Sequence, residues 1–386
     1  MKIEARNPVH WLYLALFGSW TLVAILLRPL LPKRQPQRIL LYGHKLGGNL
    51  LALYQRLRTM PDEFEVAFLT IDPGYHRELL QAGERAVLAT SPRCIGWLAT
   101  ARALVSDHGL HALLPMLFLS DLKFFDVWHG IPFKGFDADD FRVQHHYDEV
   151  WVTSPLLKAL YQERYGFRAE RVHATGNPRT DLLQGGEAAR AAARRGFSLP
   201  EHGRLVLFAP TWQQDDRHRR IFPFGTEEHE FMACLAGIAR RHGAMVGLRM
   251  HLNTGRTTTG IVEGIVHLPF ARYPDTERLL VATDILVCDW SSIAFDFMVL
   301  QRPTVFLDVE LPFRKGFSLD ASYRHGEVVG SLAALEAALD RYLADPATFA
   351  AEHGARVKAL RREVYAGRDD GRATERCIER MRLALR

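Results

Sequence analysis

The chain has 386 residues, of which 48% are hydrophobic and 24% charged, as in a globular protein long enough for two domains. Its 49 Lys and Arg residues exceed its 44 Asp and Glu residues by a margin that suits phosphate or anionic lipid ligands, and no stripe of basic and aromatic residues indicates nucleic acid. The four dispersed cysteines form no C-x-x-C pair, which excludes a disulfide framework or a zinc site and indicates core thiols in a reducing compartment.

The first apolar segment lies near the N-terminus. Val9 to Leu27 contains 19 residues without Asp, Glu, Lys or Arg, which is just enough to span a hydrocarbon core of about 30 Å. More Lys and Arg follow this segment than precede it, so the positive-inside rule places the large C-terminal part in the cytoplasm. We therefore expect residues 1–36 to form a membrane anchor and basic connector at the cytoplasmic face of the cell membrane. A helix that lies in the membrane interface or packs on the protein is the alternative.

The following part alternates short apolar strands with helices, which predicts a doubly wound α/β sheet. The loop Gly43–Asn49 matches neither G-x-G-x-x-G nor the Walker A pattern, so it predicts no phosphate site. The expected strands lie at residues 38–42, 64–71, 147–153 and 172–176, with one more that begins at Phe124, and the expected helices lie at residues 49–58, 75–82, 94–103 and 154–165.

Glycine and proline stop the strand that begins at Phe124, so His129 falls at its carboxyl end, where open α/β sheets place their ligand crevice. Imidazole titrates near neutrality and is a good proton acceptor, although a histidine at a strand end is more often structural. Lys134 follows a few residues later, and Arg179 lies in a loop from which a guanidinium can reach a ligand. The D-x-D sequence within Asp137–Asp140 can bind a divalent cation, but such a cluster more often decorates a loop and a helix N-terminus.

A Gly-, Ala- and Arg-rich connection at residues 184–195 precedes a second alternation of strands and helices. We expect a first Rossmann-like domain over residues 37–185 and a second over residues 186–386, with loops of both facing one cleft. This arrangement is that of many nucleotide-dependent transferases. The expected strands are residues 204–208, 244–250, 265–268, 285–288 and 304–307, and the expected helices are residues 228–242, 274–281, 331–343 and 373–385.

The strand Ile285 to Cys288 is apolar without polar alternation, as expected for a strand buried on both faces. A helix opens close to Ser291 and Ser292, where two hydroxyls and unpaired backbone N–H groups make an anion site suited to phosphate. The alternative is that one of the two serines only caps the helix.

Several motifs then occur in the order and spacing of one family: WHGIPFKG, GNPRTD, LFAPTW, RMH, TDILVCDWSSIAFDF, RPTVFLD and DDGRATER. From about Gly43 to Arg376, the chain resembles the CDP-glycerol glycerophosphotransferases of teichoic-acid synthesis, whose relatives include ribitol-phosphate transferases and capsule polymerases. The resemblance implies a GT-B fold, with an acceptor-side N-terminal domain and a C-terminal domain that holds the CDP-linked donor.

The resemblance also implies roles for individual residues. His129 and His251 match the two histidines that the family needs for activity, with His129 as general base. Ser291 and Ser292 match its phosphate-binding serines, and Arg249 with His251 would hold the diphosphate. The further candidates for anion contacts are Lys134, Arg179, Arg314 and Lys315.

The implied reaction moves an alditol phosphate, glycerol phosphate first, from CDP-glycerol or CDP-ribitol to a hydroxyl of a lipid-linked or glycan acceptor and releases CMP. It requires no cofactor and no metal ligand set is expected. Trp290 replaces the family's usual tyrosine and Leu252 its usual proline, so the donor pocket differs and the alditol stays open. The alternative function is that of a GT-B nucleotide-sugar glycosyltransferase in cell-surface polysaccharide synthesis.

Overall fold

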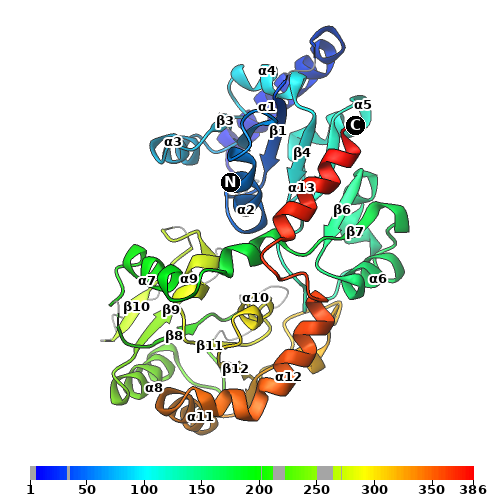
Figure 1. Ribbon diagram of the computed structural model, residues 1–386. Helices are drawn as coiled ribbons and strands as arrows, with labels where there is room; N and C mark the ends of the chain where they lie inside the picture. Colours follow the sequence, from blue (N-terminus) through cyan, green and yellow to red (C-terminus); the bar gives the residue numbers. More distant parts are fainter. Residues whose placement is uncertain (1–5, 33–34, 201, 212–221, 250–263, 271) are drawn as a thin grey trace. The chain divides into compact units, whose positions relative to one another are not determined.

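Figure 1 shows the computed structural model, which describes residues 6–32, 35–200, 202–211, 222–249, 264–270 and 272–386. The chain forms two compact units, which are described separately. Unit 1 comprises Met1–His129, Asp137–Asp181 and Arg368–Arg386, and unit 2 comprises Gly130–Phe136 and Leu182–Gly367. Compared with the expected domains, Gly130–Phe136 counts with unit 2, the first 36 residues and the C-terminal helix count with unit 1, and the main boundary lies four residues earlier, after Asp181.

Unit 1 is built on a seven-stranded parallel sheet of order β3-β2-β1-β4-β5-β6-β7. Because β1 pairs with both β2 and β4, the direction of winding reverses between β1 and β4, as in a doubly wound fold. The predicted parallel α/β sheet is therefore confirmed. The strands are β1 (Gln37–Tyr42), β2 (Phe64–Thr70), β3 (Ala86–Leu88), β4 (Ala103–Ser106), β5 (Lys123–Asp126), β6 (Glu149–Val152) and β7 (Val172–Ala174).

Helices cover both faces of this sheet, because successive residues of β1 point into different cores. Ile39 and Leu41 pack in one cluster with residues of α2, α3 and α13, whereas Leu40 and Tyr42 pack in another with residues of α1, α4 and α5. The α-helices of unit 1 are α1 (Pro8–Leu27), α2 (Gly48–Arg58), α3 (Pro73–Gln81), α4 (Arg93–Thr100), α5 (Leu114–Leu119), α6 (Pro155–Glu163) and α13 (Ala373–Ala384), and its 3-10 helices are η1 (Arg28–Leu30), η2 (His111–Leu113), η3 (Ala138–Phe141), η4 (Gln144–His146), η5 (Ala169–Arg171) and η6 (Pro178–Leu183), the last of which runs on into unit 2.

Two strands of unit 1 were not expected. β3 falls in a stretch for which no element was predicted, and Ala103–Ser106 forms β4, where the sequence favoured the end of a helix. Four buried residues are too few for their periodicity to separate a strand from a helix. The apolar run that follows, residues 112–119, lies in η2 and α5.

Unit 2 repeats the same winding in a six-stranded parallel sheet of order β10-β9-β8-β11-β12-β13. Here β8 pairs with both β9 and β11, so the reversal lies between β8 and β11. The strands are β8 (Leu205–Phe208), β9 (Met245–Leu248), β10 (Ile265–His267), β11 (Ile285–Cys288), β12 (Thr304–Leu307) and β13 (Glu327–Val329), and the helices are α7 (Gly186–Gly196), α8 (Glu228–Arg241), α9 (Thr276–Ala282), α10 (Ile293–Val299), η7 (Ala321–Tyr323), α11 (Leu332–Ala344) and α12 (Ala347–Tyr365).

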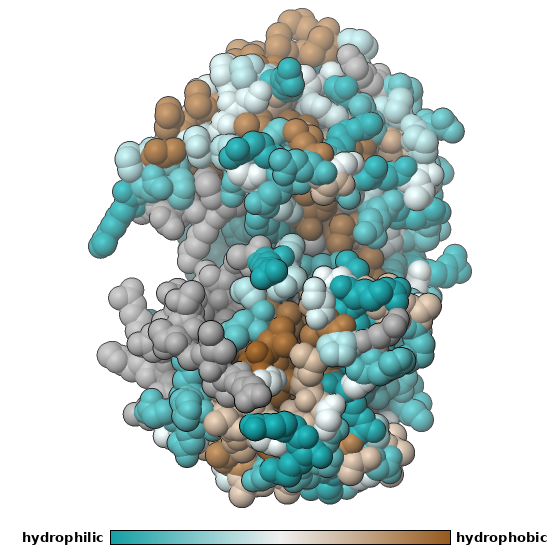
Figure 2. All heavy atoms as spheres, turned by 90° about the vertical axis from the view of Figure 1, so that its left-hand side faces the viewer, coloured by the Kyte–Doolittle hydropathy of each residue, from teal (hydrophilic) through white to brown (hydrophobic). Residues whose placement is uncertain are grey.

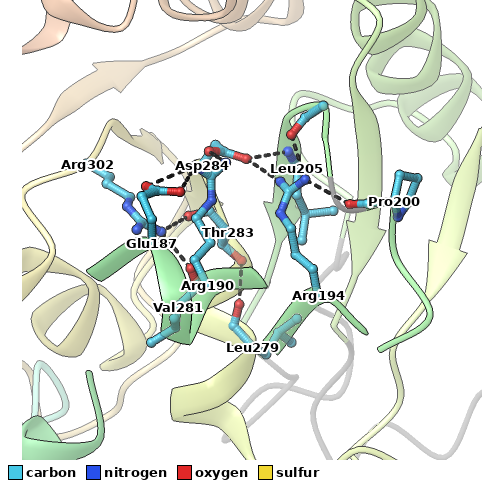
Figure 3. Close-up of polar contacts among 11 residues, drawn as sticks. Glu187, Arg190, Arg194, Pro200, Leu205, Leu279, Val281, Thr283, Asp284 and Arg302 are labelled. Atoms are coloured by element: carbon cyan, nitrogen blue, oxygen red, sulfur yellow. Dashed lines mark hydrogen bonds and ion pairs between the residues drawn. The ribbon is translucent and has the colours of Figure 1, made fainter. Parts of the chain in front are cut away.

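The expected connection at residues 184–195 is largely the helix α7, which an ionic network attaches to unit 2. Figure 3 shows Arg190 and Arg194 reaching from α7 to Asp284, which directly precedes β11. The second carboxylate oxygen of Asp284 also accepts the backbone N–H of Leu205, the first residue of β8, at 2.7 Å. The network thus fixes α7 to the amino ends of two central strands.

The helix α1 packs along unit 1. Together with η1 it is long and apolar enough to cross a membrane by length and composition. However, Phe17, Thr21 and Ala24 are fully buried against the unit, and the Trp20 indole donates to the Thr90 carbonyl at 3.1 Å. Buried residues recur at helical spacing on this face, so this face is not available to lipid.

Candidate active site

The candidate site of unit 1 lies where β1, β4 and β5 end. His129 is the third residue after β5, and its ring Nδ1 lies 3.1 Å from the carbonyl oxygen of Asp107, which directly follows β4 and precedes His108. A carbonyl can only accept, so Nδ1 carries the proton and Nε2 carries the lone pair. The imidazole is thereby held in the tautomer that can accept a proton at Nε2.

A second histidine stacks on His129. The His108 ring lies parallel to the His129 ring at 4.6 Å between centroids and 13° between planes, and the ring of His44, after β1, lies 4.1 Å from that of His108. Nδ1 of His108 lies 2.6 Å from the Asp107 carboxylate. A Cβ on Gly43 would lie 2.3 Å from that carboxylate, so the loop after β1 needs glycine at this position.

These neighbours set the ionisation of His129. Desolvation by the surrounding protein lowers its pKa to about 3, the charge of His108 acts in the same direction, and the nearby Arg179 does so more weakly. Burial, with His108, likewise lowers the pKa of His44 to about 4. Both imidazoles are therefore neutral at physiological pH. Burial and the charge of Asp107 raise the pKa of Asp126, the last residue of β5, well above its usual value, which favours its neutral form.

Arg179 lies beside this cluster. Its backbone N–H donates to Asn49 Oδ1 at 3.0 Å, and its guanidinium lies so close to Gly48 that a Cβ there would be 2.9 Å from Nη2. The loop expected to present Arg179 therefore brings it to the same end of the sheet as His129.

The motif that contains His129 is divided between the two units. Phe133 is buried in unit 2, where its ring packs 4.5 Å from that of Phe295 and 6.0 Å from that of Trp290. Lys134 forms an antiparallel bridge with Phe317, and its ammonium lies 5.5 Å from the Phe136 ring. Because the Phe317 ring lies 4.9 Å from that of Trp290, this isolated bridge brings the Lys134 backbone close to Trp290 within unit 2.

The candidate site of unit 2 lies at its own reversal point. Asp289, directly after β11, accepts the Thr211 backbone N–H at 2.8 Å and the Thr211 hydroxyl at 2.5 Å, so it joins the ends of β11 and β8. Ser291 and Ser292 follow and are half-buried at the start of α10. Ser292 is the N-cap residue of α10, but its side chain makes no capping hydrogen bond to the helix.

Arg249 is buried after β9, and protein groups engage its guanidinium. Nη1 donates to the carbonyls of Leu268 at 3.1 Å and Tyr273 at 2.6 Å, and Nη2 donates to the Thr276 hydroxyl at 2.9 Å. Burial lowers its pKa to about 10. The arginine thus joins the end of β10 to the start of α9, and its expected contact with phosphate stays a prediction. His251 lies outside the described residues.

The remaining expected contacts lie at the surface. Arg314 and Lys315 are exposed. In the D-x-D segment, Asp137 caps η3 by accepting the Asp139 N–H, and Asp140 accepts the Asp137 N–H in return. These two carboxylates therefore cap the N-terminus of η3, as the alternative to a cation site predicted for this segment.

Sequence reasoning missed four polar residues of the unit 1 site: His44, Asn49, Asp107 and His108. His44 and Asn49 fall in the stretch 43–49, which was expected to be a loop and was dismissed because it matches no phosphate-binding pattern, although Asn49 in fact lies in α2. Asp107 and His108 directly follow β4, so recognising that strand would have placed them at a strand end. What could have identified these residues was their position near the end of a strand rather than a sequence motif.

Two doubly wound parallel sheets, each with polar side chains at the carboxyl ends of its reversal strands, define a two-unit α/β protein whose candidate ligand sites lie at those edges. The family described as CDP-Glycerol:Poly(glycerophosphate) glycerophosphotransferase matches residues 31–383. The chain belongs to this family, and the resemblance drawn from its motifs is confirmed.

Known relatives of the chain act in teichoic acid synthesis. The teichoic acid ribitol-phosphate polymerase TarK of Staphylococcus aureus (strain NCTC 8325 / PS 47) is 28% identical over 233 residues, which cover 55% of this chain and 45% of TarK. The teichoic acid poly(glycerol phosphate) polymerase of Bacillus subtilis (strain 168) is 23% identical over 293 residues, which cover 69% of this chain and 38% of that polymerase. The matched part is thus less than half of either relative.

A solved structure of the wall teichoic acid polymerase TagF shares the fold. It superposes with a TM-score of 0.74 at 16% identity and covers 96% of this chain and 94% of that chain. The common fold therefore extends through both units.

Proposed function

We propose that the chain transfers an alditol phosphate, glycerol phosphate first, from a CDP-linked donor to a hydroxyl of a lipid-linked or glycan acceptor. Membership of the family supports the reaction class. The observation that carries the proposal is the state of His129, a neutral imidazole whose Nδ1–H is committed to the Asp107 carbonyl and whose Nε2 is left to accept a proton. Unit 1 would hold the acceptor and unit 2 the donor.

The chemistry then balances as follows. The acceptor oxygen forms a bond to the phosphorus that carries the alditol, and the bond from that phosphorus to the bridging oxygen breaks. CMP leaves with the electron pair, while the acceptor proton moves to His129 Nε2. An approaching anionic diphosphate favours the protonated form of the His129 imidazole, so the pKa of His129, which is low in the free enzyme, rises as the donor binds. Positioning and electrostatic stabilisation are enough for such a transfer.

In unit 2, the Ser291 and Ser292 hydroxyls would donate to the diphosphate. Asp289 supports this role because it ties the loop after β8 to the start of α10, which fixes the two serines with respect to the end of the sheet. Hydrogen bonds to a charged phosphate are stronger than those between neutral groups. Arg249 and His251, with Lys134, Arg179, Arg314 and Lys315, are proposed as further contacts to anionic groups of the substrates. No divalent cation is needed for these roles.

The decisive experiment is a donor screen. Purified protein is incubated with CDP-glycerol, CDP-ribitol, UDP-sugars and GDP-sugars in the presence of a lipid-linked alditol phosphate acceptor, and CMP release and product mass are measured. CMP release with a product heavier by one or more alditol phosphates is expected. Release of UDP or GDP instead would establish the glycosyltransferase alternative.

We also propose that α1 attaches the protein to the cytoplasmic face of the membrane as an interfacial helix. Its buried face packs on unit 1, which favours an interfacial helix over one that crosses the bilayer. The opposite face exposes Trp11, Leu22 and Leu26 at helical spacing, at 55%, 51% and 72% exposure. Figure 2 shows apolar side chains gathered at the top of that view, at the height where Figure 1 shows α1 and α4. The free, mostly buried cysteines support a reducing compartment.

A further inference from the structure

We propose that Asn49 is a positioning residue that holds His129 and Arg179 in their working arrangement. The inference rests on the proposed function, because it assigns the catalytic step to His129. Asn49 is the second residue of α2 and is fully buried. Its amide reaches two loops that are far away in the sequence.

The three polar contacts of the Asn49 side chain use its whole amide. Nδ2 donates to the carbonyls of Val127 and Trp128, each at 2.9 Å. Oδ1 accepts the Arg179 backbone N–H at 3.0 Å. Carbonyls only accept and a backbone N–H only donates, so the amide can be placed in one orientation only.

The turn that Asn49 holds is an unfavourable one. Trp128 has φ of +41°, in the left-handed region that bulky residues avoid. Such a conformation persists where its surroundings fix it, and it tends to occur at functional sites. The Asn49 amide donates to the carbonyl that precedes Trp128 and to the carbonyl of Trp128 itself, so it directly opposes relaxation of the turn.

His129 depends on this turn for its position. Its ring lies 4.3 Å from the Trp128 ring, tilted by 33°, and stacks on the His108 ring at 4.6 Å, with Nδ1 on the Asp107 carbonyl. Were Trp128 to relax, its contact with the His129 ring would change and the Nδ1 hydrogen bond would lengthen. A misplacement of about 1 Å in a reacting group can cost on the order of 100-fold in rate.

The same side chain also fixes the Arg179 loop. Gly48, the residue before Asn49, has φ of +53° and lies against the Arg179 guanidinium. Gly48 and Asn49 therefore set both the side chain and the backbone of Arg179. The first two residues of α2 thus position both His129 and Arg179. This role was hidden because the segment matches no phosphate-binding pattern.

The test uses the full chain and the variant Asn49→Asp, which keeps the shape but turns a second oxygen toward the two carbonyls. Tyr54→Phe is the matched control, because Tyr54 lies on the same helix, is fully buried and loses one hydrogen bond from the Arg85 N–H. We expect kcat for transfer from the active CDP-alditol to fall at least 30-fold in Asn49→Asp, with KM for the donor within twofold. Tyr54→Phe should keep kcat within threefold. Asn49→Ser replaces Asn49→Asp if the latter fails to fold.

A second readout is independent of activity. Isotope-labelled histidine gives an NMR signal for His129, assigned by its loss in His129→Gln. We expect this signal to move in Asn49→Asp and to stay in place in Tyr54→Phe. Unchanged kcat in Asn49→Asp, or an equal loss in Tyr54→Phe, would overturn the inference. If the parent protein releases CMP from no donor, the proposed function fails, and the NMR signal alone decides whether Asn49 positions His129.

Discussion

Replacing both serines at the start of α10 separates a phosphate site from a helix cap. We expect Ser291→Ala with Ser292→Ala to weaken the binding of CDP-glycerol, or of whichever CDP-alditol is active, and to leave stability nearly unchanged. Two hydroxyl donors to a charged diphosphate disappear, whereas Ser292 makes no side-chain capping hydrogen bond that could be lost.

The size of the effect follows from the kind of hydrogen bond. One to a charged group is worth about 1.5 to 3 kcal/mol, so the loss of even one lowers affinity by roughly tenfold or more. A cap that does bond its helix behaves differently. The Ser331 hydroxyl accepts the Ala334 N–H at 3.2 Å at the start of α11, and Ser331→Ala should cost about 1 kcal/mol of stability.

Ser331→Ala is therefore the matched control, since Ser331 lies in the same unit and its replacement should lower stability while leaving donor affinity unchanged. Calorimetry with the CDP-alditol and thermal unfolding are measured on both variants. We expect the double variant to lose affinity at an unchanged Tm, and Ser331→Ala to lose roughly 2–4 °C in Tm at unchanged affinity. Unchanged donor affinity in a folded double variant would refute the phosphate role of the two serines.

Four further predictions concern other parts of the chain. His129→Ala should bind the donor normally in calorimetry and lose transfer by about 10²- to 10⁴-fold in the CMP assay, because the proton acceptor is gone. Leu26→Glu with Leu30→Glu should abolish sedimentation with anionic vesicles at an unchanged Tm, because both side chains are exposed, at 72% and 75%. Asp284→Asn should lower the Tm, because it removes the charge that Arg190 and Arg194 share. His325 is fully buried, and burial lowers its pKa from 6.5 to about 3. Between these two pH values the His325 imidazole takes up a proton only in the unfolded chain, so stability falls as the pH is lowered. Urea titration should show stability falling by about 1.4 kcal/mol less per pH unit in His325→Gln than in the parent.

Each of these predictions has an opposing result. Transfer by His129→Ala within threefold of the parent would remove the base assignment. Vesicle binding that survives both glutamates would place the membrane contact elsewhere. Deletion of residues 1–36 should cause aggregation, because it uncovers the core that Phe17 and Ala24 fill. An unchanged Tm in Asp284→Asn, or parallel pH profiles for His325→Gln and the parent, would contradict the other two.

The sequence predicted those parts of the fold in which local pattern and tertiary burial agree. The run Ile285–Cys288 is apolar throughout because both faces of β11 are covered, and the helix after Ser292 follows as expected. β4 was missed because Ala103–Ser106 is as short as a helix end and equally apolar. The packing of α1 on unit 1 was only the alternative expectation, because 19 uncharged residues suit a lipid environment and a protein core alike.

The site residues divide along the same line. His129, Ser291 and Ser292 could be proposed because each follows a recognisable strand within four residues and belongs to a family motif. Asn49 could not, because its role depends on Val127, Trp128 and Arg179 meeting it in space. A buried amide that bonds two distant loops leaves no periodic trace in the sequence.

The two units solve one structural problem in the same way. In each, an aspartate directly follows the strand at which winding reverses: Asp107 after β4 and Asp289 after β11. Each lies against the loop that leaves the first strand, with Asp107 against Gly43 and Asp289 bonded to Thr211. In unit 2 the Asp289 carboxylate joins the ends of β8 and β11 through its two hydrogen bonds to Thr211. In unit 1 the Asp107 carboxylate bonds His108, and its carbonyl accepts from His129. In both units, therefore, an aspartate at the reversal point organises the polar groups that we propose as ligand contacts.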